Sequence, residues 1–107
     1  MKPIDVNHAR FPLDKIHPVI YDDGEFSVVW GAWVDDNGIV CPKGLGMRWN
    51  ESPGPKGFPT SGPNFTPVWL VIPQELSVPF LTSLLGKDYS NPKAILHALQ
   101  EIEARGS

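Results

Sequence analysis

The chain has 107 residues, of which 41% are hydrophobic and 20% are charged, and its formal net charge is −3. This length allows one domain with one hydrophobic core, and this balance of apolar and charged residues is typical of a folded protein. An acidic chain has no general field that attracts nucleic acid or an anionic membrane, so nucleic-acid binding is disfavoured. We therefore expect a single domain over residues 1–107, with residues 1–15 as its least ordered part.

No stretch of the sequence approaches the roughly 18 apolar residues of a membrane span. The first 15 residues carry five charged side chains and lack the apolar region of a secretory signal. Cys41 is the single cysteine, so no internal disulfide is available. These features predict a cytoplasmic protein without membrane contact, in which Cys41 is a small residue of a strand.

Two segments in the first third are typical of β-strands. Residues 16–21 (IHPVIY) are rich in β-branched residues, and Pro18 predicts an edge strand or a bulge because proline cannot donate to a ladder. In residues 26–34 (FSVVWGAWV), every second residue from Phe26 onward is apolar and defines a core face. The opposite face carries Trp33, which needs cover from a helix, another chain or a ligand, or else remains partly exposed.

A hairpin is predicted next, because Asn37-Gly38 is the strongest short signal for a type I′ turn. The returning strand should cover about residues 39–49. We expect it to bend near Pro42 and residues 44–46, where proline and glycines weaken regular pairing.

A proline-rich loop is predicted over residues 50–67, where five prolines and three glycines exclude a helix or a central strand. The prolines from Pro55 to Pro67 recur every four residues and form no PxxP motif, so a standard SH3 ligand is excluded. A loop of this length is functional, packed on itself or disordered. Phe58 and Phe65 favour packing.

The continuous apolar run at residues 68–72 (VWLVI) predicts a strand buried on both faces, which we place at the centre of the sheet. A helix should follow, capped by Ser77 with Pro79 in its first turn and ending at Gly86. A last helix should be capped by Ser90 or Asn91. The expected fold is α+β, an antiparallel sheet of about four strands with two C-terminal helices packed on one face.

Signatures of catalysis or cofactor binding are weak. The stretch GLGMRW begins like GxGxxG but has Trp49 at the third glycine position, and no P-loop or nucleophile elbow occurs. Histidines and Cys41 are scattered without metal-ligand spacing. His97 and Glu101 share a helix face, which favours a solvated pair. The sequence thus predicts no cofactor and no metal site, and it argues against an enzyme.

The remaining signal is a basic and aromatic cluster at the start of the loop. Residues 43–56 carry three basic residues and one acidic residue, a local charge of +2 in an acidic protein. A guanidinium beside aromatic surfaces can bind a carboxylate, a phosphate or a stacked base. The candidate binding residues are Arg48, Trp49, Lys56 and Phe58. The alternative is packing, in which Phe58 holds the loop down and Arg48 pairs with Glu51 or a backbone carbonyl.

Three functions remain open from the sequence. The first is a non-catalytic module that binds a protein or peptide through the loop and its aromatics. This module is expected to self-associate as a homodimer through Trp33 and Val29, because the Trp33 face lacks a predicted cover. The second is a small-anion site or minor enzyme with Arg48 as the anion-binding residue. The third is single-stranded nucleic-acid binding through Lys43, Arg48, Lys56 and Phe58.

Overall fold

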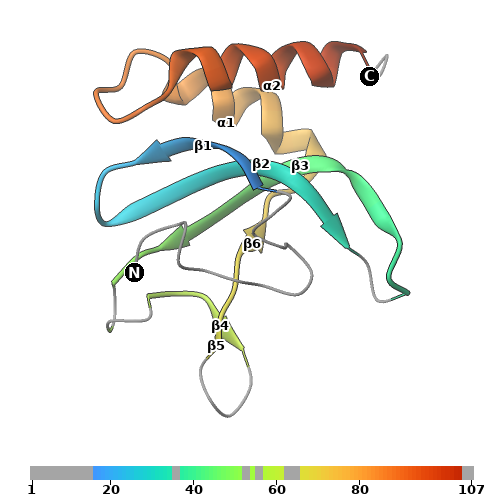
Figure 1. The fold of residues 1–107 in the computed structure, drawn as a ribbon. Helices are drawn as coiled ribbons and strands as arrows, with labels where there is room; N and C mark the ends of the chain where they lie inside the picture. The colour runs from blue at the N-terminus through green and yellow to red at the C-terminus, as the bar shows by residue number, and fades with distance from the viewer. Residues whose placement is uncertain (1–15, 35–36, 52–53, 55–56, 62–65, 105–107) are drawn as a thin grey trace.

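The computed structural model describes residues 16–34, 37–51, 54, 57–61 and 66–104. Within these residues, an antiparallel sheet has the strand order β1-β2-β3-β6, and two helices pack on one of its faces (Figure 1). The elements of this layer pair are β1 (Ile16–Asp22), β2 (Phe26–Val34), β3 (Val40–Trp49), β6 (Leu70–Val71), α1 (Gln74–Leu84) and α2 (Pro92–Ala104). A separate small hairpin joins β4 (Thr60–Ser61) to β5 (Thr66–Pro67). The predicted α+β class is confirmed.

The main core lies between the sheet and the helices. Trp30 of β2 and Leu45 of β3 are fully buried there, against Leu81 of α1 and Ile95 of α2. The alternation of β2 produces this arrangement because its apolar residues point to the helix side at every second position. The predicted core face of β2 is therefore confirmed for Phe26, Val28 and Trp30.

The long β2–β3 ladder forms the centre of the sheet. Its regular register is interrupted once, where the Gly31–Gly44 pair is followed by Trp33–Cys41, so β3 carries one residue more than β2 between these pairs. The predicted bend of this strand is confirmed at that position. Gly38, in the turn between β2 and β3, has the positive φ of 78° that was expected there.

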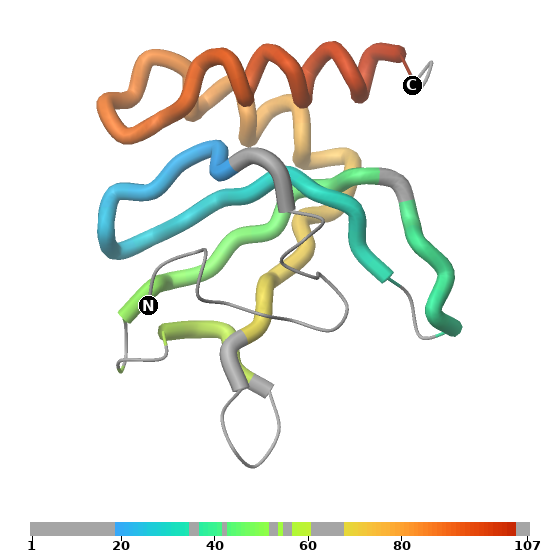
Figure 2. Tube along the Cα trace, viewed as in Figure 1, coloured from blue at the N-terminus to red at the C-terminus, as the bar shows by residue number. Residues whose placement is uncertain are grey.

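The prediction of a central strand at residues 68–72 is wrong. Only Leu70 and Val71 pair with β3, and β6 lies at the edge of the sheet rather than at its centre. Leu70 remains 48% exposed. Prolines bound the segment on both sides, and one edge of β3 is already paired with β2, so the run can only add briefly to the other edge. Figure 2 follows the chain from the β4–β5 hairpin through β6 into α1.

The helix boundaries follow local chemistry only in part. α1 begins at Gln74, directly after Pro73, so Ser77 lies inside the helix and does not cap it as predicted. Pro79, predicted in the first turn, therefore lies in the helix interior, and the helix ends at Leu84, two residues before Gly86. The Ser77 hydroxyl donates instead to the carbonyl of Pro73, at 3.4 Å. α2 begins as predicted, with the Asn91 side chain accepting the backbone N–H of Ala94 at 3.2 Å. In the described part of the chain, neither helix is long and apolar enough to cross a membrane.

Candidate binding site

The predicted binding residues do not form one site. Arg48 and Trp49 are neighbours in β3, so their side chains point to opposite faces of the sheet. Phe58 forms a β-bridge with Trp49 and lies beside it. Lys56 lies outside the described residues. The structure therefore brings Trp49 and Phe58 together and separates Arg48 from both.

Arg48 is a buried structural residue, with 0% of its surface exposed. Its Nη1 donates to the carbonyl of Val68 at 3.2 Å, and its Nε donates to the Trp49 carbonyl at 3.4 Å. Burial lowers the pKa of Arg48 from its usual value, although a guanidinium stays protonated at neutral pH. The contact agrees with the packing interpretation, and it leaves no guanidinium surface open to an anion or a nucleic acid in solution.

The sheet face opposite the helices is partly covered by the chain itself. Val29 is fully buried under Trp69, which is 3% exposed, and the partly buried Val19, Trp33 and Val71 pack around them. Val29 therefore has no surface to offer a second copy in this arrangement. Trp33 keeps partial exposure, and its role in an oligomer interface stays a prediction.

An aromatic row crosses the helix-side face of the sheet near the end of β3. We define it as Tyr21, Phe26, Trp49 and Phe58, whose successive ring centroids lie 6.2, 5.5 and 6.1 Å apart. Its first two members pack partly against the core. Trp49 and Phe58 remain 40% and 50% exposed. The row thus begins in the core and ends at the surface.

The exposed end of the aromatic row is held by backbone bonds. The Trp49 N–H donates to the Phe58 carbonyl at 2.7 Å, and the Phe58 N–H donates to the Trp49 carbonyl at 2.9 Å. Gly57 permits this approach because its φ is +70° and a Cβ there would overlap the Trp49 carbonyl oxygen. The two exposed rings are therefore presented by a fixed pair of backbone segments.

A hollow of about 430 Å³ adjoins Trp49 and is lined by Gly24, Glu25, Trp49 and Glu51. The neighbouring turn is rigidly bonded, since the Asp23 carboxylate accepts the backbone N–H groups of Glu25 and Phe26 at 2.9 and 2.8 Å. Burial by itself would raise the pKa of the Asp23 carboxyl. The N–H donors of Phe26 and Glu25 outweigh this effect together with the Tyr21 hydroxyl, so the pKa of Asp23 lies below its ordinary value.

A buried polar chain supports the same end of the sheet. The Ser27 hydroxyl donates to Asn50 Oδ1 at 2.7 Å, and Asn50 Nδ2 donates to Asp22 Oδ1 at 3.1 Å. Ser27 is fully buried and Asn50 is 3% exposed. These hydrogen bonds tie Asn50, the residue after Trp49, to β2 and to the end of β1, which helps to fix the position of the aromatic row.

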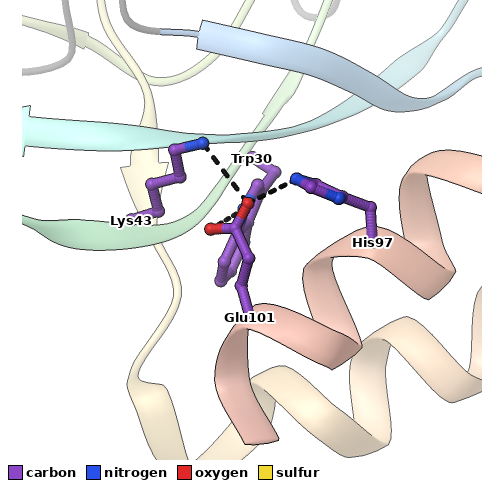
Figure 3. Close-up of polar contacts among 4 residues, drawn as sticks. All are labelled: Trp30, Lys43, His97 and Glu101. Atoms are coloured by element: carbon purple, nitrogen blue, oxygen red, sulfur yellow. Dashed lines mark hydrogen bonds and ion pairs between the residues drawn. The ribbon is translucent and has the colours of Figure 1, made fainter. Parts of the chain in front are cut away.

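A second polar cluster joins α2 to the sheet, as Figure 3 shows. Glu101 accepts from Trp30 Nε1 at 3.4 Å, from Lys43 Nζ at 3.4 Å and from His97 Nε2 at 2.5 Å. The predicted His97–Glu101 pair is therefore present, but it is not simply a solvated pair, because the Glu101 side chain is 27% exposed and also contacts the sheet. The i,i+4 spacing indicated only the His97 partner. Trp30 and Lys43 are too distant in sequence to be predicted.

The pKa of Glu101 reflects opposing effects. Partial burial raises it, whereas the Lys43 ammonium, the hydrogen bonds from Lys43 and Trp30 and the field of His97 together lower it below its ordinary value. The carboxylate therefore remains charged at neutral pH and links α2 to β2 and β3.

The described residues contain no group of three or more His, Cys, Asp or Glu side chains that could hold a metal ion. Comparison of the chain with protein-family models, with curated proteins and with solved structures gave no match.

Proposed function

We propose that the protein is a non-catalytic binding module that engages a protein or peptide through Trp49 and Phe58. The observation that supports this is the combination of exposure and order at these two rings. They remain 40% and 50% exposed, yet reciprocal backbone bonds hold them side by side. A backbone that is already fixed loses little further conformational entropy on binding, and aromatic side chains dominate the energetics of many interfaces.

The surroundings of the pair suit recognition of a peptide. The hollow beside Trp49 is lined partly by Glu25 and Glu51, so polar groups border this exposed indole. This is the arrangement of an interface centre with a polar rim. Arg48, the residue that the anion and nucleic-acid hypotheses share, is buried instead.

Panning a random peptide library against the protein tests the proposal. Peptides that bind the unmodified chain should lose at least tenfold in affinity for Trp49→Ser and for Phe58→Ser, since truncating a central interface aromatic costs about 2 kcal/mol or more. Leu96→Ser is the matched control, because Leu96 is 52% exposed on α2, away from the aromatic row. Circular dichroism of each variant checks that it is folded. Failure to enrich any peptide, or equal binding by Trp49→Ser, contradicts the proposal.

Self-association is the second form of this proposal, in which the partner is another copy of the chain. Light scattering after size exclusion would distinguish the surfaces. A dimer that Trp49→Ser converts to a monomer places the contact at the exposed end of the aromatic row. A dimer that persists in Trp49→Ser and is lost in Trp33→Ser supports the interface predicted from the sequence.

A further inference from the structure

A cavity of about 340 Å³ lies between the first half of β3, the β6–α1 connection and the end of α2. It is separate from the hollow beside Trp49, with which it shares no lining residue. Its volume falls at the lower end of the range of small-molecule sites, which is roughly 300–1,000 Å³. The lining residues are Trp33, Cys41, Lys43, Gly44, Val71, Ile72, Pro73, Gln74, Ser77 and Ile102.

The lining combines apolar walls with one charge. Trp33, Val71 and Ile102 supply an indole and two branched aliphatic side chains, which suit a planar apolar group. Lys43 is the one charged side chain among the described residues that line the cavity. An apolar cavity with a single ammonium group selects a ligand that has an apolar body and one negative charge.

Lys43 can bind the negative group of such a ligand without leaving the Glu101 carboxylate unpaired. Its side chain is 39% exposed, and its ammonium contacts Glu101 at 3.4 Å, which uses one of its three N–H donors. Glu101 also accepts from His97 and Trp30, so it keeps partners when Lys43 turns toward a ligand.

Ser77 completes the wall of the cavity at α1. It is 3% exposed, and its hydroxyl donates to the Pro73 carbonyl at 3.4 Å, so its polar group is paired within the chain. The lining thus offers a cation at Lys43 and an indole at Trp33.

We infer that this cavity binds a small planar monocarboxylate, with its ring against Trp33 and its carboxylate on the Lys43 ammonium. The inference is independent of the peptide-binding proposal, because neither Trp49 nor Phe58 lines the cavity.

Titration of the ¹⁵N-labelled protein with benzoate, followed by NMR, tests this inference. A ligand of this size should bind with a Kd on the order of 1 mM. Saturable shifts are expected at the Trp33 indole N–H and at the backbone amides of Cys41, Gly44 and Gln74. Benzamide has the same shape without the charge, so it should bind roughly tenfold more weakly. Equal affinity for benzamide and benzoate overturns the assigned ligand class.

Lysine variants separate a specific contact from general charge. Lys43→Met should weaken benzoate binding roughly tenfold, as expected for loss of one charge-assisted hydrogen bond, and Lys43→Arg should restore most of the affinity. Lys87→Met also removes one positive charge, but Lys87 lies in the connection between α1 and α2 and does not line the cavity. This variant should leave the affinity for benzoate unchanged. Unchanged binding by a folded Lys43→Met variant overturns the inference.

The single cysteine gives an independent measurement. Cys41 lines the cavity and is partly exposed, so iodoacetamide should alkylate it slowly and benzoate should slow the reaction further. The protection should follow the NMR saturation curve and should disappear in Lys43→Met. Benzoate shifts confined to residues outside the lining, or saturating shifts without protection of Cys41, contradict binding in this cavity.

Discussion

Arg48 and Trp49 show how strongly one step along a strand changes the environment of a side chain. The Arg48 guanidinium is buried against the carbonyls of Trp49 and Val68, whereas the Trp49 indole is 40% exposed on the other face. The strand period of two residues is sufficient to cause this separation. Their roles differ accordingly, because Arg48 holds the segment before β6 against the sheet and Trp49 presents a surface.

Replacing Arg48 with alanine should lower the free energy of unfolding by about 2–4 kcal/mol, because a fully buried side chain is removed and the carbonyl of Val68 loses a charge-assisted donor. Arg48→Lys should also destabilise, since an ammonium cannot reproduce the planar fork of the guanidinium. Urea denaturation measures both effects. Lys87→Ala, at an exposed position, should change stability by no more than about 0.5 kcal/mol. An equally small effect of Arg48→Ala would show that the contact is dispensable.

Gly57 is the second residue with a specific steric role. Gly57→Ala should destabilise the protein by about 2 kcal/mol or more, because the new Cβ overlaps the Trp49 carbonyl oxygen as well as opposing the positive φ. Gly38→Ala is the matched control, with a φ of 78° and no atom within 4 Å of the added Cβ, and should cost about 1 kcal/mol. Thermal or urea unfolding of the pair gives the comparison. Equal costs would mean that backbone conformation alone decides the effect.

At the scale of elements, β3 is the strand on which the other parts converge. One edge pairs with β2 along most of its length, and the other pairs in pieces with β6 and with Phe58. Its helix-side face also carries Leu45 into the core. α2 docks on this sheet through its apolar face and through the Glu101 contacts with β2 and β3.

The attachment of α2 should depend on pH through Glu101. The pKa of this carboxyl lies below its ordinary value of 4.5 in the folded chain, so the folded state favours the charged form. Its contribution to stability is therefore present above that ordinary value and is lost as pH falls through the lower folded-state pKa. Glu101→Gln should lose less stability than the unmodified protein between about pH 6 and pH 3.

Urea denaturation across this pH range provides the measurement, with Glu103→Gln as the control. Glu103 lies two positions further along α2 and is exposed, so its replacement should leave the pH profile as it is in the unmodified chain. Superimposable profiles for Glu101→Gln and the unmodified chain would count against the link between α2 and the sheet.

At the scale of the whole molecule, the sheet separates two unequal apolar clusters. The helix side holds most of the buried residues, whereas the opposite side holds the small cluster around Val29 and Trp69. Both clusters share β2, because Trp30 points to one side and Val29 to the other. Loss of the sheet would therefore expose both at once.

Unfolding should accordingly be a single cooperative transition. Tryptophan fluorescence, which includes Trp30 on one side and Trp69 on the other, should give the same midpoint as the far-ultraviolet signal of the helices. Two separate midpoints would contradict the prediction of one domain over residues 1–107. Circular dichroism and fluorescence recorded on the same urea series provide the comparison.

The local patterns of the sequence were sufficient for much of the fold. Strict alternation predicted β2 and its core face, and Asn91 before Pro92 predicted the start of α2. They were insufficient for β6, because an apolar run shows that a segment is buried without showing where in the sheet it pairs. Ser77 was misassigned as a cap because the helix begins one turn earlier, directly after Pro73, without a side-chain cap.

The sequence by itself determined the α+β class and the β2–β3 hairpin. Only the tertiary structure decided that Arg48 is buried, that Phe58 lies beside Trp49 and that Glu101 meets Lys43 and Trp30. The physical reason is the distance along the sequence over which each interaction acts. Alternation and capping act over a few residues, whereas burial and these pairings depend on segments that only the folded chain brings into contact.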